Sequence, residues 1–327
     1  MKINISIAFK RFFYLFLKII ITFLVLYFIF LKVDFKGFLS VFSRINYRYV
    51  ILAFLIYLLQ FLISTLKWQK LVNFFGTKIN FKFFLKFNFI GLFYATIMPG
   101  GLVTGDLIKG YRVFKSSEDR KMILNSILMD RITGLIGLLV LTILIVIFIF
   151  QLNKFPYRLT IILFSVVLLF FIVVFLFFSK KILSYLSKFI KRFFPKIENF
   201  SEKIFGTINT YSKNLGLLIF AVLTGILIYF VNTFCVYLAT LALGINISFV
   251  NILAVNCLAT FAVIVAPITF AGFGIREGFF VYFLGLIGTG KESAMALSLL
   301  VGLICLLLSL AGGLLELRSL FAKKQNI

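Results

Sequence analysis

The chain has 327 residues, of which 62% are hydrophobic and 13% are charged. Soluble domains are about 45–50% apolar and about 25% charged, so this composition excludes a soluble globular protein. It also excludes a disordered chain, because disorder requires low hydrophobicity. The length suits several membrane-spanning helices of about 20 residues each.

The composition also limits the chemistry. There is no histidine, which excludes a Ser-His-Asp triad and histidine-ligated metals. Cys235, Cys257 and Cys305 lie far apart in apolar runs, so we expect small apolar side chains rather than metal ligands or disulfides. We therefore expect no metal and no cofactor, and we assign no catalytic residue.

The formal net charge is +24, from 34 Lys and Arg against 10 Asp and Glu. In a soluble chain this excess would indicate a nucleic-acid partner. In a chain this apolar it is better explained by anionic lipid headgroups and by the excess of basic residues in cytoplasmic loops. We expect membrane lipids as partners and no nucleic acid.

Apolar segments of spanning length follow one another along the chain. In chain order they are residues 12–31, 49–66, 83–98, 132–153, 159–179, two within 214–275, and 294–315. The first is too long for a signal peptide and is not followed by a cleavage site, so it is expected to be retained. The fourth continues a helix that begins near Met122, which places Asp130 and Arg131 in its first turns. Residues 214–275 carry no charge, and a turn is expected near Gly244.

A basic segment, residues 180–213, lies between these spans. Apolar residues recur at helical spacing from Ile182 to Phe193, and lysines fill the other face. This pattern predicts an amphipathic helix in the membrane interface, on the cytoplasmic side. An ordinary basic loop remains the alternative. With 180–213 inside, residues 109–121 are also inside. Residues 67–82 and the N-terminus are inside too if the chain crosses back after Pro99. If the broken segments only dip in and return, the N-terminal part has the opposite orientation.

Two segments interrupt the helical pattern, one in each half of the chain. Each begins at a proline that ends a span and continues through glycines into charged residues. The residues that break the pattern are Pro99, Gly100, Gly101 and Gly105 in the first segment and Pro267, Gly272, Gly274 and Gly278 in the second. Irregular backbone within a bilayer is tolerated where protein buries it or where it lines a wet cavity. Paired breaks indicate a transporter-like site between inverted repeats, and simple kinks in ordinary helices are the alternative.

Charged side chains lie next to these breaks and at or within the spans. An ionisable group near the bilayer centre costs about 2.5–3.5 kcal/mol, so such groups are expected to be functional or paired. The candidate substrate-binding residues are Lys109, Arg112, Arg131, Arg276, Asp106, Asp130 and Glu277. Because neighbours on a helix do not face each other, we expect each member of the adjacent pairs 130–131 and 276–277 to find its partner on another helix. A net cationic pocket suits a phosphate, which arginine binds with two hydrogen bonds. An ion-pair network that only locks the bundle is the alternative.

One motif is dismissed. Residues 285–292 approach the phosphate-binding pattern G-x-x-x-x-G-K-[ST], but Glu292 replaces the hydroxyl residue and an apolar span follows. We expect no ATP site there.

At these positions the chain resembles the transmembrane region of lysylphosphatidylglycerol synthases, which is shared with stand-alone flippase-like membrane proteins. The matching pieces are Met98-Pro-Gly-Gly with Gly105, Asp106 and Lys109, then Asp130-Arg131-Ile-Thr-Gly134, then Pro267 and Gly272-Phe-Gly-Ile-Arg-Glu-Gly278. The resemblance extends from about residue 50 to 318. It implies a domain that moves aminoacylated phosphatidylglycerol between leaflets, without the soluble aminoacyltransferase domain. The chain departs from this pattern at Lys109, where many relatives carry arginine. The point charge of a lysine holds a phosphate less rigidly than a guanidinium does, so this departure bears on which headgroup is bound.

The predicted fold class is an all-α, polytopic helical membrane protein. We expect about eight transmembrane helices and two broken, re-entrant or half helices. They form one flippase-like domain over residues 1–327, with pseudo-repeated halves 1–155 and 156–327. The location expected is the cell (inner or plasma) membrane, with a multi-pass topology.

The leading functional hypothesis is a flippase for a phosphate-containing lipid, either aminoacyl-phosphatidylglycerol-like or glycan-linked. The alternatives are a membrane transferase acting on a polyprenyl-phosphate-linked sugar, with Asp106 or Glu277 as base, and a membrane anchor for a partner enzyme. A lipid-modifying enzyme or a glycosyltransferase would be such a partner. The sequence leaves the oligomeric state open.

Overall fold

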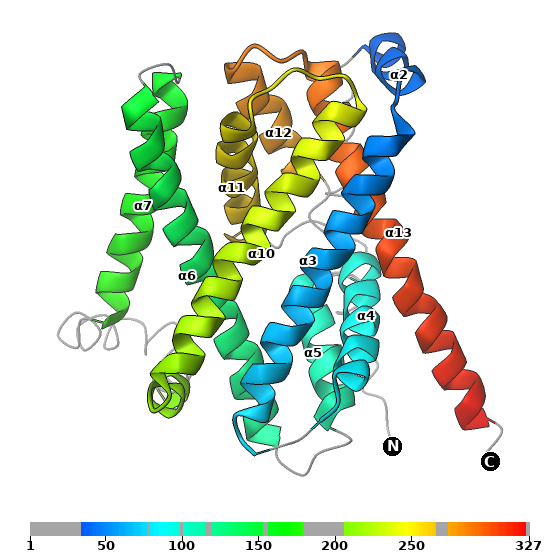
Figure 1. Cartoon of the computed structure of the whole chain (residues 1–327), viewed down its shortest axis with the longest axis vertical. Coiled ribbons are helices and arrows are strands. Elements are labelled where there is room, and N and C mark those ends of the chain that lie inside the picture. The colour runs from blue at the N-terminus through cyan, green and yellow to red at the C-terminus, as the bar shows by residue number, and fades with distance from the viewer. Residues whose placement is uncertain are drawn as a thin grey trace, which may run out of the picture.

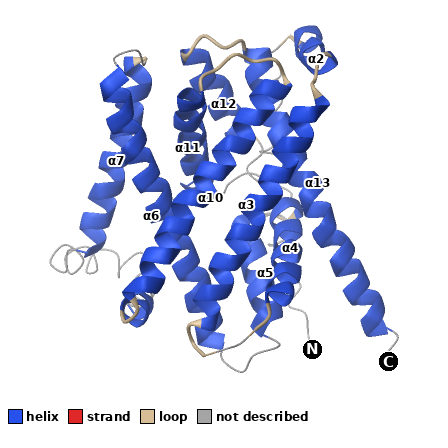
Figure 2. Ribbon diagram, in the orientation of Figure 1, coloured by secondary structure: helices blue, strands red, loops and turns tan. Residues whose placement is uncertain are grey.

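The computed structural model describes residues 34–76, 79–98, 101–114, 120–152, 156–178, 206–265 and 274–324. The helices over this part of the chain are α2 (Phe35–Ser43), α3 (Tyr47–Asn73), α4 (Phe81–Ile97), α5 (Leu102–Phe114), α6 (Arg120–Leu152), α7 (Tyr157–Phe178), α10 (Leu215–Ala242), α11 (Phe249–Val265), α12 (Ile275–Leu286) and α13 (Lys291–Lys324). The described residues contain no strand (Figure 2). The predicted class, an all-α polytopic membrane protein, is confirmed.

Asparagine side chains begin three of these helices. The Oδ1 atoms of Asn46, Asn80 and Asn214 accept hydrogen bonds from the second or third backbone N–H of α3, α4 and α10, at 3.1, 3.3 and 3.0 Å. Such caps satisfy donors that have no partner within the helix. Each apolar run therefore has a defined start, and its length decides how far the helix reaches.

Four helices of the described chain are long and apolar enough to cross a membrane. They are α3, α6, α10 and α13, with candidate spans Tyr47–Asn73, Met122–Ile149, Leu215–Ala242 and Lys291–Ser319. At 1.5 Å per residue each extends for about 40 Å, which exceeds a hydrocarbon core of about 30 Å. The spans expected at 49–66 and 294–315, and the first of the two in 214–275, lie within these helices, and α6 covers the span expected at 132–153 as far as Leu152.

Two pairs of shorter helices lie between the long ones. Helices α4 and α5 pack together toward one end of the molecule, and α11 and α12 pack together toward the other (Figure 1). They have 17, 13, 17 and 12 residues, and a full span needs about 20. Each pair leaves one end and returns to it. The segments expected as full spans at 83–98 and as the second in 214–275 are therefore members of such pairs, with 17 residues each.

The ends of the long helices place the basic segments. Helix α3 ends and α4 begins at the end of the molecule where α5 ends and α6 begins (Figure 1). Helix α10 begins and α13 ends there as well. The basic stretches 67–82 and 109–121 thus adjoin helix ends on one side, as in the arrangement favoured from the sequence.

Glycines allow the helices to approach closely. A Cβ atom added to Gly137 on α6 would lie 2.7 Å from the backbone of Gly225 and Ile226 on α10. One added to Gly312 on α13 would lie 2.0 Å from the carbonyl oxygen of Phe89 on α4. At Gly137 and Gly312 the helices therefore pack backbone to backbone.

A short helix over residues 206–212 packs against the end of α3. The Tyr211 hydroxyl is buried and donates to the carbonyl oxygen of Leu71 at 2.8 Å, and its ring stacks on Phe74. Burial raises the pKa of Tyr211, and the Asp130 carboxylate raises it further, so the hydroxyl stays protonated.

Several expectations fall outside the described residues. They are the first span at 12–31, residues 180–205 of the amphipathic segment, and the break residues Pro99, Gly100, Pro267 and Gly272.

Candidate functional site

Five charged residues from three helices form one cluster, the α5–α6 cluster: Lys67, Asp106, Lys109, Asp130 and Arg131. Helix α3 supplies Lys67, α5 supplies Asp106 and Lys109, and α6 supplies Asp130 and Arg131. Lys67 Nζ lies 3.1 Å from Asp130 Oδ1, Lys109 Nζ lies 3.0 Å from Asp106 Oδ1, and Arg131 Nη2 lies 2.5 Å from Asp106 Oδ2. Asp106 therefore bridges a cation of its own helix to a cation of α6.

Lys67 and Asp130 form the more buried part of this cluster. Their side chains are 2% and 13% exposed, and Lys67 Nζ also donates to the backbone carbonyl oxygen of Asp130 at 2.9 Å. Breaking such a buried pair leaves an uncompensated charge. Lys67 is thus a structural cation that holds α3 against α6.

Arg131 is the open part of the cluster. Its side chain is 40% exposed, whereas those of Asp106 and Lys109 are 10% and 8% exposed. Arg131 Nε and Nη2 both bind Asp106 Oδ2, and the other N–H groups of the guanidinium have no hydrogen bond to the described residues. Three cations face two carboxylates, so the cluster carries a net charge of +1, and its accessible donors are on Arg131.

Uncharged side chains fix Lys109 in this arrangement. Its Nζ atom lies 3.4 Å from Asn88 Oδ1 on α4 and 4.5 Å from the centre of the Trp68 ring. Asn88 in turn donates to Thr65 Oγ1 at 2.7 Å, and Trp68 donates to Ser126 Oγ at 3.3 Å. Lys109 therefore combines a carboxylate, an amide and an aromatic face.

The break between α4 and α5 brings this site together. Gly101 adopts a φ of +52°, which suits glycine. A Cβ atom on Gly105 would lie 2.4 Å from the carbonyl oxygen of Gly91. Glycine at position 105 therefore lets α5 lie directly on α4. This close packing places the next residue, Asp106, in the cluster.

Arg112 lies further along α5 and belongs to a separate pair. It bonds Glu316 on α13, which also accepts from the Tyr94 hydroxyl at 3.2 Å. The Glu316 side chain is 6% exposed. This balanced pair ties α5 and α4 to α13.

The second group of charges, the α12 cluster, consists of Gly274, Arg276, Glu277 and Ser298. Arg276 Nη2 lies 2.7 Å from Glu277 Oε1, and Ser298 Oγ donates to the same oxygen at 3.1 Å. The other oxygen of Glu277 accepts from the backbone N–H of Gly274, which begins α12 with a φ of +89°. The backbone N–H of Gly278 donates to Gly274 at 2.9 Å, as the first turn of the helix requires.

These contacts correct one prediction. Asp130 and Arg131 do find partners on other helices, but Arg276 and Glu277 bind each other although they are neighbours. The reason is the cap: Glu277 turns back over the helix start to reach the Gly274 N–H, which places its carboxylate beside the Arg276 side chain.

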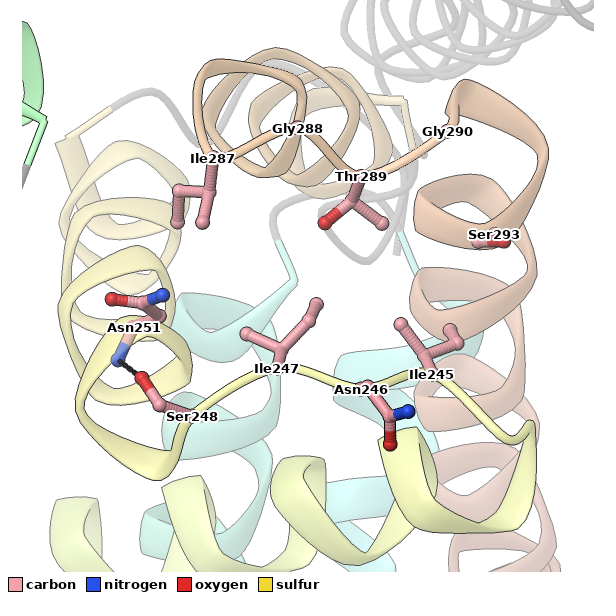
Figure 3. A pocket seen from close by; sticks show the side chains of 10 residues that line it. All are labelled: Ile245, Asn246, Ile247, Ser248, Asn251, Ile287, Gly288, Thr289, Gly290 and Ser293. Carbon is pink, nitrogen blue, oxygen red and sulfur yellow. Dashed lines mark hydrogen bonds between the residues drawn. The ribbon is translucent and has the colours of Figure 1, made fainter.

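A cavity of 420 Å³ lies at the end of the molecule away from the α5–α6 cluster (Figure 3). It is lined by residues 245–248 of the α10–α11 connection, residues 287–290 of the α12–α13 connection, Asn251 of α11 and Ser293 of α13. The lining is uncharged, so the cavity offers hydroxyl and amide groups but no phosphate-binding cation. The dismissed phosphate-loop pattern lies here as a turn between two helices, with Gly288 at a φ of +88°.

The structure therefore gathers four of the seven predicted residues, Asp106, Lys109, Asp130 and Arg131, and places Arg112 in one separate pair and Arg276 with Glu277 in another. Sequence reasoning missed Lys67 and Glu316, which are buried and paired. Within the described residues, no group of three or more Cys, Asp or Glu side chains could hold a metal ion.

Comparison with known proteins gives the family. The family model for the "Lysylphosphatidylglycerol synthase TM region" matches residues 15–313. A curated relative, the UPF0104 membrane protein PH1989 of Pyrococcus horikoshii, is 24% identical over 308 residues, which cover 84% of this chain and 88% of the relative. With nearly the whole chain matched, the protein belongs to the lysylphosphatidylglycerol synthase TM region family.

Proposed function

We propose that this protein is a multi-pass flippase of the cell membrane that moves a phosphate-containing lipid between leaflets. The observation that carries this proposal is the net positive charge of the α5–α6 cluster together with the partly exposed Arg131 guanidinium. The other two charged groups, Arg112 with Glu316 and Arg276 with Glu277, are balanced pairs.

The depth of the cluster supports binding within the membrane. Asp106 precedes the end of α5 at Phe114 by about 12 Å, at 1.5 Å per residue. Charges at such a depth are costly and mark substrate pathways. A single unbalanced cation is stabilised there by an anion, and a phosphodiester supplies one negative charge.

Each residue has a role in this proposal. Arg131 binds the phosphate oxygens through its free N–H groups, because a guanidinium matches the phosphate geometry. Asp106 holds Arg131 in place through Nε and Nη2. Lys109 adds positive charge behind the phosphate. The acyl chains stay in the bilayer while the headgroup enters between the helices. The family description is consistent with an aminoacyl-phosphatidylglycerol-like headgroup, and a glycan-linked lipid satisfies the same phosphate chemistry.

The test is lipid translocation in proteoliposomes with tail-labelled fluorescent phosphatidylglycerol. Arg131→Gln should slow translocation at least ~10-fold, because hydrogen bonds to charged groups contribute about 1.5–3 kcal/mol. Arg318→Gln is the matched control, since this exposed arginine lies at the end of α13, and it should leave the rate unchanged. No movement with the wild type, or equal rates for Arg131→Gln and the wild type, would overturn the proposal. A glycosylated product formed from a polyprenyl-phosphate sugar would instead favour a transferase.

A further inference from the structure

A chain of amide side chains crosses between α3, α10 and α11. Asn232 Nδ2 donates to Gln60 Oε1 at 3.1 Å, and Asn256 Nδ2 donates to Asn232 Oδ1 and to Thr233 Oγ1, both at 2.9 Å. We call Gln60, Asn232, Thr233 and Asn256 the amide chain. None of its members is ionisable, so it can lie in apolar surroundings at a lower cost than an ion.

The amide chain leaves hydrogen-bonding groups unused, on the buried Asn256 and on the partly exposed Gln60. Asn256 is 6% exposed, and both of its N–H groups are bonded while its Oδ1 accepts no hydrogen bond from the described residues. Gln60 uses its oxygen, and its two N–H groups have no acceptor within the described chain. Most buried polar groups are satisfied, so exceptions need an explanation. A free acceptor together with free donors is the complement of a hydroxyl group, which both donates and accepts.

The position of the amide chain is between the two charged clusters. Tyr229, one turn before Asn232 on α10, reaches the α5–α6 cluster: a Cβ atom on Gly134 would lie 3.7 Å from both Tyr229 Oη and Lys67 Nζ. Toward the other end, Tyr57 lies one turn from Gln60 on α3, and its hydroxyl bonds Cys305 Sγ at 3.2 Å. Cys305 lies about two turns from Ser298 of the α12 cluster along α13.

Along α3 the order is therefore Lys67 of the α5–α6 cluster, then Gln60 of the amide chain, then Tyr57. The contact of Tyr57 with Cys305 continues along α13 to Ser298 of the α12 cluster. Helices α3 and α10 pack against each other (Figure 1). An uncharged hydrogen-bonding site between two charged clusters lets a headgroup remain hydrogen-bonded in the region where a further fixed charge would have the highest free-energy cost.

We propose that the amide chain is a midpoint binding site that takes a hydroxyl-bearing lipid headgroup in transit by hydrogen bonds alone. The proposal rests on the flippase function and adds a selectivity to it. Lipids whose phosphodiester carries free hydroxyl groups pass readily, and lipids of the same charge without hydroxyl groups pass slowly.

The experiment compares two tail-labelled fluorescent lipids in proteoliposomes. Phosphatidylglycerol has free hydroxyl groups, and phosphatidylmethanol is a phosphodiester of the same charge with none. The wild type should move phosphatidylglycerol faster by ~10-fold, the worth of one or two hydrogen bonds. Asn256→Leu, which keeps the size of the side chain and removes its polar atoms, should slow phosphatidylglycerol to the rate of phosphatidylmethanol.

Two further variants distinguish a specific loss of selectivity from misfolding. Gln60→Leu lies on the partly exposed face of α3 and should reduce the same selectivity. Thr142→Val is the matched control, because the Thr142 hydroxyl is buried on α6 and already bonds the carbonyl oxygen of Leu138 at 2.8 Å; its selectivity should equal that of the wild type.

Binding of lipid at the α5–α6 cluster is measured separately from transport, by tryptophan fluorescence. The chain has one tryptophan, Trp68, whose ring lies 4.5 Å from Lys109 Nζ, so its fluorescence reports on that cluster. Titration with dihexanoyl phosphatidylglycerol in detergent should change Trp68 emission equally in the wild type and in Asn256→Leu. Equal rates of the two lipids in the wild type, or selectivity retained in Asn256→Leu, would overturn the midpoint site alone. Movement of neither lipid by the wild type would overturn the flippase function.

Discussion

Lys67 is the residue whose removal tests the buried network most directly. Lys67→Met replaces the side chain by an unbranched apolar one of nearly the same length and removes the charge. The Asp130 carboxylate, 13% exposed, then loses the ammonium at 3.1 Å, and its backbone carbonyl oxygen loses the donor at 2.9 Å. Arg131 remains nearby but is bound to Asp106.

The expected loss of stability is large. Removing one partner of a buried ion pair costs about 3–5 kcal/mol, because the other charge stays buried. Lys70→Met is the matched control on the same helix. The Lys70 side chain is exposed, with its ammonium 4.0 Å from the Phe220 ring, and loss of such a contact costs about 0.5–1 kcal/mol.

The assay is reversible unfolding in mixed micelles, followed through Trp68 fluorescence. A double-mutant cycle with Asp130→Asn isolates the pair, and the expected coupling energy is at least ~2 kcal/mol. The double variant should be more stable than Lys67→Met alone, since it contains no unpaired carboxylate. If Lys67→Met cost no more than Lys70→Met, or if the cycle gave no coupling, the ion pair described here would be refuted.

Three further predictions concern packing, capping and thiol burial. Gly312→Ala should destabilise the fold by ~2 kcal/mol or more, because the added Cβ would lie 2.0 Å from a backbone oxygen, whereas Gly285→Ala, with nothing within 4 Å, should stabilise it by about 0.5–1 kcal/mol; thermal unfolding of both decides, and equal effects would contradict the packing. Glu277→Gln should cost ~2 kcal/mol, because its fully buried carboxylate accepts from Arg276, Ser298 and the start of α12; an unchanged melting temperature would argue against the cap. Maleimide should label neither Cys235 nor Cys257 before unfolding, since both are at most 1% exposed, and rapid labelling of the folded protein would contradict their burial.

The long helices could be predicted from the sequence because charge marks their limits. Helix α6 begins within two residues of the expected start at Met122, and α10 ends just before the expected turn at Gly244. Helix α11 was expected as the second span in the uncharged stretch 214–275, but its pairing with α12 and its return to the same end of the molecule were not. Hydropathy measures apolar character and does not measure depth in the membrane.

The charged residues that form the cluster could be singled out beside a helix break, as at Asp106, or as an adjacent pair within a helix, as at Asp130 and Arg131. Lys67 follows a long apolar run, so its position indicated a loop at the membrane edge, and only tertiary contact with α6 shows that it is buried. Glu316 was hidden in the same way at the end of α13. The amide chain gave no signal to a search for charges. Isolated Gln and Asn residues within apolar runs, as at Gln60 and Asn256, are the pattern that could have revealed it.

The spacing of polar groups along α3 has an electrical consequence. Tyr57, which bonds Cys305, and Lys67, in the α5–α6 cluster, are about 15 Å apart at 1.5 Å per residue. That distance is about half of a hydrocarbon core of about 30 Å. A headgroup with one negative charge that moves over this distance would therefore cross about half of the membrane voltage. Each 100 mV would change its energy by ~1 kcal/mol, so the direction of net movement would depend on the membrane potential even without a coupled ion.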